Sequence, residues 1–271
     1  MKLISTILNN KRQDINCALI PFITAGYPSF SSSIEAIYTL DREGADIIEL
    51  GVPYSDSLAD GPLIQYSSKV ALSQGIYIEE VLNILKIVTN KVTSPIIIFT
   101  YYNPILVRGL DKFIMEISSS GAKGLMIPDL PIEETDYMIC LCSFYKIELI
   151  LFIAPTSSHT RISSIIDKSP GCLYLVSSTG VTGMRHNINY NLNELSDYIK
   201  LQTNKLVMIG FGISNTSQAS EFSQWDIDAI VIGSAFIKIL SNQDLSTSDM
   251  MLELGIFCNS IKLAINMKNN N

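Results

Sequence analysis

The sequence has no apolar run of the about 18 to 20 residues that a membrane-spanning helix requires. It also lacks the features of a secretory signal, because the apolar segment near its start is short and no small-residue cleavage site follows it. No Arg-rich and Ser-rich transit extension precedes the first predicted helix. We therefore expect a protein that is not membrane-bound and works in the compartment where it is made.

Basic residues are also scarce. The chain has 19 Lys and Arg against 26 Asp and Glu, a formal net charge of −7, and no basic cluster, which argues against nucleic acid as a partner. The two histidines, His159 and His186, have no pattern of partners that suggests catalysis or metal binding. Five cysteines are scattered without metal-ligand spacing, and we expect reduced, buried thiols at Cys17, Cys140, Cys142, Cys172 and Cys258.

Apolar residues are abundant, at 47% of 271 residues, and they recur in one repeating unit. Each unit is a short run rich in Ile, Val and Leu, a loop with Gly, Pro or Asp, and an amphipathic helix. Strands are predicted at residues 19–23, 47–50, 96–100, 124–127, 149–153, 173–176, 206–209 and 229–232. Eight such units over about 250 residues favour a single (β/α)8 barrel domain spanning 1–271, an α/β fold, over an open doubly wound sheet.

The helices between these strands are predicted from their apolar periodicity. They cover residues 32–42, 78–89, 110–118, 133–145, 160–168, 192–201 and 249–266. An additional amphipathic helix is expected near the N-terminus. The long interval between the second and third strands leaves room for another short helix at 63–73.

Two carboxylates are placed where a barrel has its active site. Glu49 lies at the end of the second strand between Ile48 and Leu50, so its carboxyl is poorly solvated and its pKa should rise toward neutrality. Asp60 lies in the loop that follows and can reach the same mouth. We expect one carboxylate to exchange protons while its companion stays ionised.

Glycine-rich loops follow the last three strands, at residues 180–183, 210–214 and 233–235. Each glycine by itself is most simply a turn residue. Three such loops on adjacent strands nevertheless predict a phosphate site, because backbone N–H groups at these loops can bind an anion without Lys or Arg.

Several motifs, in order along nearly the whole chain, resemble those of the tryptophan synthase α subunit family. They are PFITAGYP (21–28), ELGVPYSDSLADGP (49–62) with IQ (64–65), YYNP (101–104), PDLPIEE (128–134), APT (154–156), YLVS (174–177), GVTG (180–183) and GFGI (210–213). The resemblance implies retro-aldol cleavage of indole-3-glycerol phosphate to indole and glyceraldehyde 3-phosphate, without metal or cofactor. It assigns proton transfer to Glu49, and to Asp60 the binding of the indole N–H.

Further substrate-binding residues are expected by position. The strand-end apolar residues suited to line a flat indole pocket are Phe22, Phe99, Met126, Ile153 and Phe211, although any one of them is more often barrel core, and Phe22 and Phe211 are the first candidates. Tyr174 matches a residue close to the catalytic glutamate, although a core tyrosine is an equally simple interpretation. Thr182 lies in a loop, roughly 178–191, that the family closes over its substrate. Gly183, Gly212, Gly233 and Ser234 complete the predicted substrate site.

A β subunit is the partner that the family implies, in a linear αββα tetramer, and it carries the pyridoxal phosphate. The residues that match its docking surface are Asp56, Asn103, Pro104, Asp129 and Pro131, although a Pro-rich loop read alone is more simply a connector. Ser57 departs from the family, which usually has proline there. We hypothesise that this makes the loop bearing Asp60 more mobile and lowers the activity of the isolated chain.

Two other functions stay open at this point. Another phosphate-binding barrel, such as an indole-glycerol-phosphate synthase or a sugar-phosphate isomerase, would fit the glycine loops, but no catalytic Lys of such a synthase is evident on the strands. A non-catalytic scaffold would fit the barrel, but Glu49 and Asp60 are both retained. The richness in Ile, Asn, Ser and Lys suggests an AT-rich genome, and hence a bacterial cytoplasm or a plastid that encodes the protein.

Overall fold

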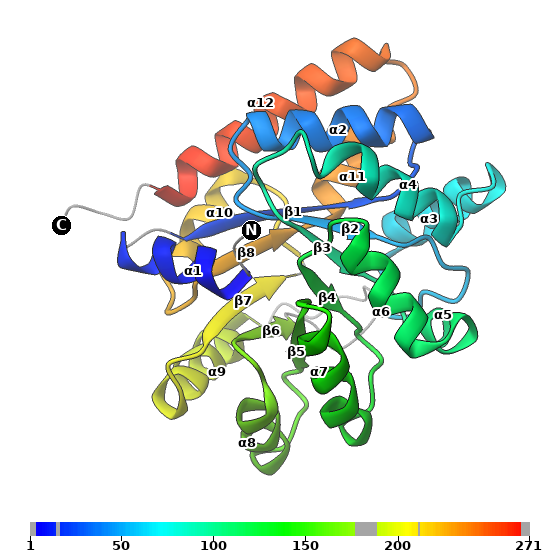
Figure 1. Cartoon of the computed structure of the whole chain (residues 1–271). Coiled ribbons are helices and arrows are strands. Elements are labelled where there is room, and N and C mark those ends of the chain that lie inside the picture. Colours follow the sequence, from blue (N-terminus) through cyan, green and yellow to red (C-terminus); the bar gives the residue numbers. More distant parts are fainter. Residues whose placement is uncertain (1–3, 15–16, 177–188, 211, 267–271) are drawn as a thin grey trace.

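The computed structural model describes residues 4–14, 17–176, 189–210 and 212–266. Eight parallel strands close into one barrel in chain order, and helices surround it (Figure 1). The strands are β1 (Ala18–Thr24), β2 (Ile48–Gly51), β3 (Ile96–Phe99), β4 (Gly124–Met126), β5 (Glu148–Ile153), β6 (Cys172–Val176), β7 (Leu206–Gly210) and β8 (Ala229–Ile232). The closed barrel confirms the predicted fold, and the open doubly wound sheet is excluded because β1 pairs with both β2 and β8.

The strands form where the chain has short runs that can be buried on both faces. β3, with the sequence IIIF, is buried at every position, and so is β8, with the sequence AIVI. Helices cover the outer face of a parallel barrel and side chains fill its inside, so such strands need no polar face. All eight lie within one or two residues of the ranges predicted from the sequence.

The helices follow the predicted order, with three additions. They are α1 (Ile4–Gln13), α2 (Phe30–Arg42), α3 (Pro62–Ser73), α4 (Ile78–Val88), α5 (Tyr102–Arg108), α6 (Leu110–Ser119), α7 (Thr135–Phe144), α8 (His159–Lys168), α9 (Asn189–Gln202), α10 (Thr216–Ser223), α11 (Ser234–Leu240) and α12 (Thr247–Asn266), with a 3₁₀ turn η1 (Ile132–Glu134). The additions are α5, α10 and α11. All three are of eight residues or fewer, too short to show a clear apolar period.

The YYNP motif begins helix α5 and is not a simple connecting loop, contrary to the simpler interpretation from the sequence. The carboxylate of Asp129 accepts a hydrogen bond from the backbone N–H of Tyr102, at 2.8 Å, and so satisfies one of the unpaired donors at the start of the helix. Pro104 lies in the first turn, where a missing N–H costs little. The helix therefore begins at the motif itself.

α1 packs against the end of the barrel where the strands begin. Ile4 and Leu8 are fully buried there. Lys11 forms an ion pair with Asp46, just before β2, at 2.8 Å, and Arg12 forms one with Asp228, just before β8, at 2.5 Å. The extra N-terminal helix predicted from the sequence thus closes this end of the barrel.

None of the five cysteines, all of which the structure describes, is in a disulfide, in agreement with the predicted reduced thiols, but not all are buried. Cys17, Cys142, Cys172 and Cys258 lie in the core, whereas Cys140 is exposed. The prediction was wrong for Cys140 because it lies two residues from Cys142 on α7, and this spacing points the two side chains to different faces of a helix. None of the helices that the structure describes is long and apolar enough to cross a membrane.

Candidate active site

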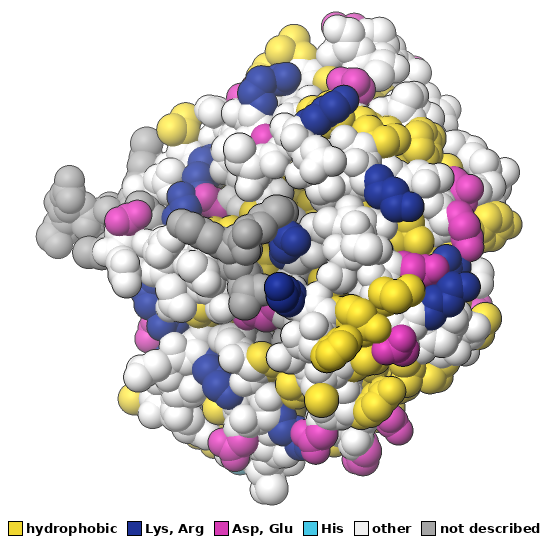
Figure 2. All heavy atoms as spheres, in the orientation of Figure 1, with side chains coloured by type: hydrophobic (Ala, Val, Ile, Leu, Met, Phe, Trp, Pro, Cys, Tyr) yellow, Lys and Arg dark blue, Asp and Glu magenta, His cyan; other side chains and the backbone are white. Residues whose placement is uncertain are grey.

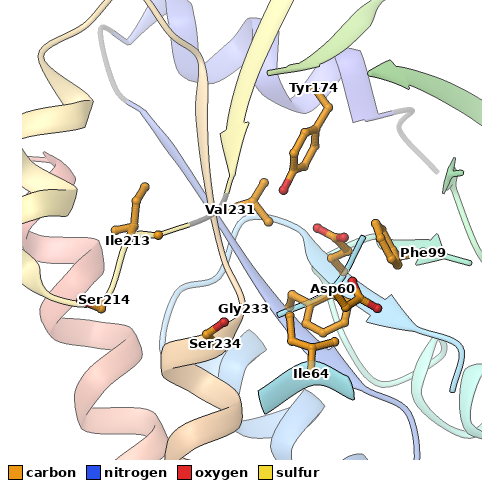
Figure 3. Close-up of a pocket in the computed structure, with 12 residues that line it drawn as sticks. Asp60, Ile64, Phe99, Tyr174, Ile213, Ser214, Val231, Gly233 and Ser234 are labelled. Carbon is orange, nitrogen blue, oxygen red and sulfur yellow. The ribbon is translucent and has the colours of Figure 1, made fainter. Parts of the chain in front are cut away.

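A pocket opens at the carboxyl ends of the strands, where barrel enzymes carry their chemistry (Figure 3). Its walls come from five strand ends and from the loops behind β2, β7 and β8. The residues that line it are Phe22, Glu49, Asp60, Ile64, Phe99, Tyr174, Gly212, Ile213, Ser214, Val231, Gly233 and Ser234. The pocket thus brings together both predicted catalytic carboxylates and six of the predicted substrate-site residues, namely Phe22, Phe99, Tyr174, Gly212, Gly233 and Ser234.

Glu49 is held rigidly by its strand, while its carboxyl has few partners. Its backbone pairs with Phe22 on β1 and with Ile97 on β3. The residue is 2% exposed, and its Oε2 atom has no hydrogen-bond partner among the described residues. Burial raises its pKa to about 8, and the negative charge of Asp60 contributes further. The predicted rise toward neutrality is confirmed, so near pH 7 the carboxyl can both give and take a proton.

Asp60 is also buried, at 5% exposure, in the loop between β2 and α3. Burial raises its pKa to about 7, and a hydrogen bond with the Tyr101 hydroxyl opposes that rise. The sequence predicted a companion carboxylate that stays ionised. The structure corrects this, because burial places the pKa of Asp60 near neutrality as well, and a further hydrogen-bond donor or a positive charge beside it would be needed to keep it fully ionised.

Aromatic rings form the wall beside these carboxylates. Phe22 and Phe99 meet edge to face, with ring centroids 5.8 Å apart. A Cβ on Gly51 would lie 2.6 Å from the Phe22 ring, so the glycine leaves the space that this ring occupies. Met126 and Ile153, also predicted for this pocket, are fully buried and do not line it. They are barrel core, because their side chains are covered from the cavity.

Tyr174 directs its hydroxyl into the pocket from β6 (Figure 3). Its neighbour on β7 is Gly210, where a Cβ would lie 1.7 Å from the Tyr174 hydroxyl oxygen. Burial raises the pKa of Tyr174, and the charges of Glu49 and Asp60 raise it further, so the phenol stays protonated. The second glycine-rich loop therefore begins with a glycine that makes room for a site residue.

The opposite end of the pocket carries small and hydroxyl-bearing residues. Figure 3 shows Ser214 and Ser234 across the cavity from Phe99 and Asp60. Gly212 has a φ of +86°, a left-handed conformation that favours glycine. Gly233 precedes α11. Among the described residues that line the pocket there is no Lys or Arg, and these residues can offer an anion backbone N–H groups and hydroxyls.

Three predicted substrate residues, Thr182, Gly183 and Phe211, lie outside the described residues, as does most of the loop at 178–191. Four further lining residues, Ile64, Ile213, Ser214 and Val231, were not predicted individually as site residues. Ile64 and Ile213 lie within recognised motifs, and Ser214 ends the predicted glycine-rich loop at 210–214. Val231 could not be predicted as a site residue, because in the sequence it is one of several apolar residues of a buried strand.

The predicted docking residues lie on one connected part of the surface. Asp56, Asn103, Asp129 and Pro131 are exposed and Pro104 is half-buried. Asn103 donates to the Tyr54 hydroxyl at 3.2 Å, which links α5 to the loop behind β2. The same two segments carry exposed apolar side chains at Leu58, Leu106 and Val107, which are 79%, 49% and 81% exposed.

Among the described residues, no group of three or more His, Cys, Asp or Glu side chains could hold a metal ion. On the face that Figure 2 shows, Lys and Arg side chains are scattered rather than gathered into one patch. The described residues therefore show no metal centre, and the face in Figure 2 shows no basic patch of the kind that binds nucleic acid.

Comparisons with known proteins agree on one family. The sequence profile described as "Tryptophan synthase alpha chain" matches residues 8–266. The chain is 58% identical to a tryptophan synthase alpha chain of Gracilaria tenuistipitata var. liui over 260 residues, 96% of each protein. It is 48% identical to that of Microcystis aeruginosa over 98% of this chain and 100% of the other. The crystal structure of tryptophan synthase subunit alpha from Legionella pneumophila matches with a TM-score of 0.88 at 29% identity, covering 98% of both chains.

Proposed function

The chain belongs to the tryptophan synthase alpha chain family, and from that membership we propose which of its residues carry out the family's lyase reaction. The reaction cleaves indole-3-glycerol phosphate into indole and glyceraldehyde 3-phosphate. The carbon–carbon bond between the indole ring and the glycerol chain breaks when the ring carbon gains a proton and the adjacent hydroxyl loses one. No proton is gained or lost overall, so one residue can serve both steps.

Glu49 is the residue we assign to both steps. With a pKa of about 8, its carboxyl is mostly protonated at neutral pH and can give its proton to the ring carbon. The carboxylate that results can then take the proton of the glycerol hydroxyl, which breaks the bond and forms the aldehyde. The Oε2 atom, which has no hydrogen-bond partner among the described residues, supports this assignment, because a buried carboxyl oxygen left without such a bond can accept a substrate hydroxyl.

Asp60 is the residue we assign to the indole nitrogen. Protonation of the ring carbon places positive charge on that nitrogen, and a carboxylate beside it stabilises the charge in a site that excludes water. The same charge favours the ionised form of Asp60 over its neutral form. Phe22 and Phe99 provide flat apolar walls suited to the indole ring, and Tyr174 lies close enough to both carboxyls to be influenced by their charge.

The phosphate is assigned to the end that carries Gly212, Gly233 and Ser234. Thr182, Gly183 and Phe211 stay predicted substrate residues on the strength of the family motifs. Ser214 and Ser234 lie across the pocket from Phe99 and Asp60, as binding of an indole with a phosphorylated three-carbon tail at both ends would require. This separation of an acidic aromatic end from an anion-binding end is the observation that carries the proposal.

We further propose that a β subunit docks on the surface formed by Asp56, Asn103, Pro104, Asp129 and Pro131, in an α2β2 assembly. The exposed apolar side chains of Leu58, Leu106 and Val107 support this, because they lie on the same two segments. The pyridoxal phosphate that condenses indole with serine would belong to the β subunit. Relatives from Gracilaria and Microcystis fit a location in a plastid or in a bacterial cytoplasm.

Indole release from indole-3-glycerol phosphate tests the assignment. The purified chain, alone and with a β subunit, should release indole, faster with the partner present, and Glu49→Gln should lower turnover at least a thousandfold while keeping the fold. Asn103→Ala is the matched surface control and should lose only the stimulation by the partner. Full turnover by Glu49→Gln would refute the role of Glu49, and no cleavage by the wild-type chain in either setting would refute the proposed site.

A further inference from the structure

We propose that Gln65 is the positioning residue for Asp60, because its side-chain amide bonds the backbone at both ends of the turn that presents the aspartate to the pocket. The inference rests on the role of Asp60 in the proposed function. Gln65 does not itself line the pocket, so its effect on the reaction passes through the aspartate.

Asp60 is the last residue of a tight turn. Its N–H donates to the Ser57 carbonyl at 3.1 Å, which closes a β-turn over residues 57–60. The tip of this turn has little packing to hold it, since Leu58 is 79% exposed. Hydrogen bonds to the backbone of the turn therefore have to fix the place from which the Asp60 carboxyl enters the pocket.

The Gln65 amide supplies two of these bonds. Its Nε2 atom donates to the Ser57 carbonyl at 3.2 Å and to the Asp60 carbonyl at 3.0 Å. An amide nitrogen has two protons to donate, and these bonds use both. One side chain thus links the first and last residues of the turn. The bond to the carbonyl of Asp60 itself limits rotation of the backbone that carries the carboxyl.

Helix α3 gives Gln65 a fixed base. Gln65 lies in the first turn of this helix, where its backbone N–H donates to the Gly61 carbonyl at 3.0 Å. Ser67, two residues further on, is fully buried, and its hydroxyl lies 2.6 Å from that of Thr24 at the end of β1. The Gln65 amide is therefore held relative to the barrel. A carboxyl fixed in this way needs less ordering when substrate binds.

A second contact holds the middle of the turn. The Tyr101 hydroxyl accepts the backbone N–H of Ala59 at 3.0 Å. Tyr101 is 4% exposed, and its ring meets that of Phe99 edge to face at 6.1 Å between centroids. Because this bond remains when the Gln65 amide is removed, we expect such a change to loosen the turn rather than to unfold it.

Gln65→Met keeps the length of the side chain and removes both donors. Turnover should fall about tenfold, because the carboxyl is less often aimed at the substrate, and KM should change less than kcat. Gln74→Met is the matched control. Gln74 directly follows α3, and its amide also donates to a distant backbone carbonyl, that of Pro28 at 2.8 Å. Its loss should leave turnover unchanged.

A double-substitution cycle with Asp60→Asn shows whether Gln65 acts through Asp60. If it does, Gln65→Met lowers turnover about tenfold in the wild-type chain and less than about twofold in Asp60→Asn, because the carboxylate that it positions is already gone. A merely structural loss would instead lower turnover by the same factor in both backgrounds.

Ligand binding provides a second measurement, which does not depend on turnover. A propyl phosphate that carries an indole ring is compared with its benzothiophene counterpart, which has no ring N–H to donate to Asp60. The wild-type chain should bind the indole compound about tenfold more tightly. Gln65→Met should lose most of this preference, and Gln74→Met should keep it. Gln65→Asn, whose amide is one methylene shorter, should behave as Gln65→Met does and keeps the inference testable if the methionine variant folds poorly.

The outcomes separate this inference from the proposed function. Loss of the preference for indole in the Gln65 variants, together with a non-additive cycle, supports the positioning role. An unchanged preference in these variants, or equal factors in both backgrounds of the cycle, overturns it. A wild-type chain without any preference for indole, or full turnover by Asp60→Asn, refutes instead the proposed role of Asp60.

Discussion

Both ends of the barrel bury carboxylates, but the two ends differ in how many hydrogen-bond partners these carboxylates have. Where the strands begin, Asp228 is 3% exposed and receives hydrogen bonds from Arg12, from Lys200 at 2.6 Å and from the Val207 N–H at 2.7 Å. Where the strands end, Glu49 is 2% exposed and has an oxygen without a partner among the described residues. Burial is the same, and only the number of partners differs.

The pKa values record this difference. Burial by itself raises the pKa of Asp228, but the hydrogen bonds and charges of Arg12 and Lys200 outweigh it and lower the pKa below its usual range. Burial raises the pKa of Glu49 to about 8, and the negative charge of Asp60 raises it further. Asp228, which has charged partners, therefore stabilises the fold in its ionised form. Glu49, whose pKa lies near neutrality, can instead exchange a proton.

Asp228→Asn should give the largest change in stability. The substitution removes the charged partner of Arg12. It leaves Lys200, whose side chain is only 9% exposed, with the more distant carboxylate of Asp226 at 3.8 Å. We expect a loss of about 2–3 kcal/mol in the free energy of unfolding, measured by urea denaturation at pH 7. Because the pKa of Asp228 is lowered, the difference from wild type should shrink as the pH falls through that pKa.

Asp60→Asn is the control from the other end of the barrel. It should leave the fold as stable as wild type or more so, since it removes a buried carboxyl whose pKa is raised. Equal losses of stability in Asp228→Asn and Asp60→Asn would mean that the two ends do not differ in the way described here.

The pH dependence of stability provides the second test of the comparison. A glutamate with a pKa of about 8 in the folded chain and 4.5 in the unfolded chain binds more protons when folded, so its contribution to stability falls as the pH rises between these values. Glu49→Gln cannot ionise. Relative to wild type, its free energy of unfolding should therefore rise steadily between pH 5 and pH 8. A difference that stays constant over this range would contradict the raised pKa.

The glycines at the two ends make a third, smaller contrast. Gly210→Ala places a Cβ 1.7 Å from the Tyr174 hydroxyl and must displace that side chain from the pocket. Turnover should fall about tenfold, as expected of a misplaced site residue. Gly171→Ala, at the other end, places a Cβ 2.8 Å from Glu148 Oε1 and 3.1 Å from Ser5 Cβ. Gly171→Ala should lower the melting temperature by loosening α1 and leave turnover almost unchanged. Loss of turnover in both variants would contradict the view that only the carboxyl ends of the strands carry the active site.

The sequence predicted the barrel and both carboxylates because each depends on local features. Runs such as residues 96–99 indicate a strand by themselves, and Glu49 stands at the end of such a run. Tyr101 could not be found in this way, because its hydroxyl bonds Ala59, 42 residues earlier in the chain. The pKa of Asp60 also depends on distant segments that bury it. Short polar helices such as α10 were missed because the Asn215 side chain that accepts the Gln218 N–H at 2.9 Å gives only a weak local signal.

Ser57→Pro should have the smallest effect and sharpens the comparison at the loop that bears Asp60. Proline at this position would reduce the freedom of the unfolded chain, by about 0.4–1 kcal/mol if its φ fits the native backbone. The Ser57 carbonyl already accepts hydrogen bonds from the Asp60 N–H and from Gln65, which fix this segment without proline. If residual motion of the loop limits the isolated chain, the variant should raise turnover by no more than about twofold, measured as indole release with and without the β subunit. Unchanged turnover and unchanged partner affinity would show instead that the backbone bonds already hold the loop, and that the site depends on what Asp60 contacts rather than on how stiff its loop is.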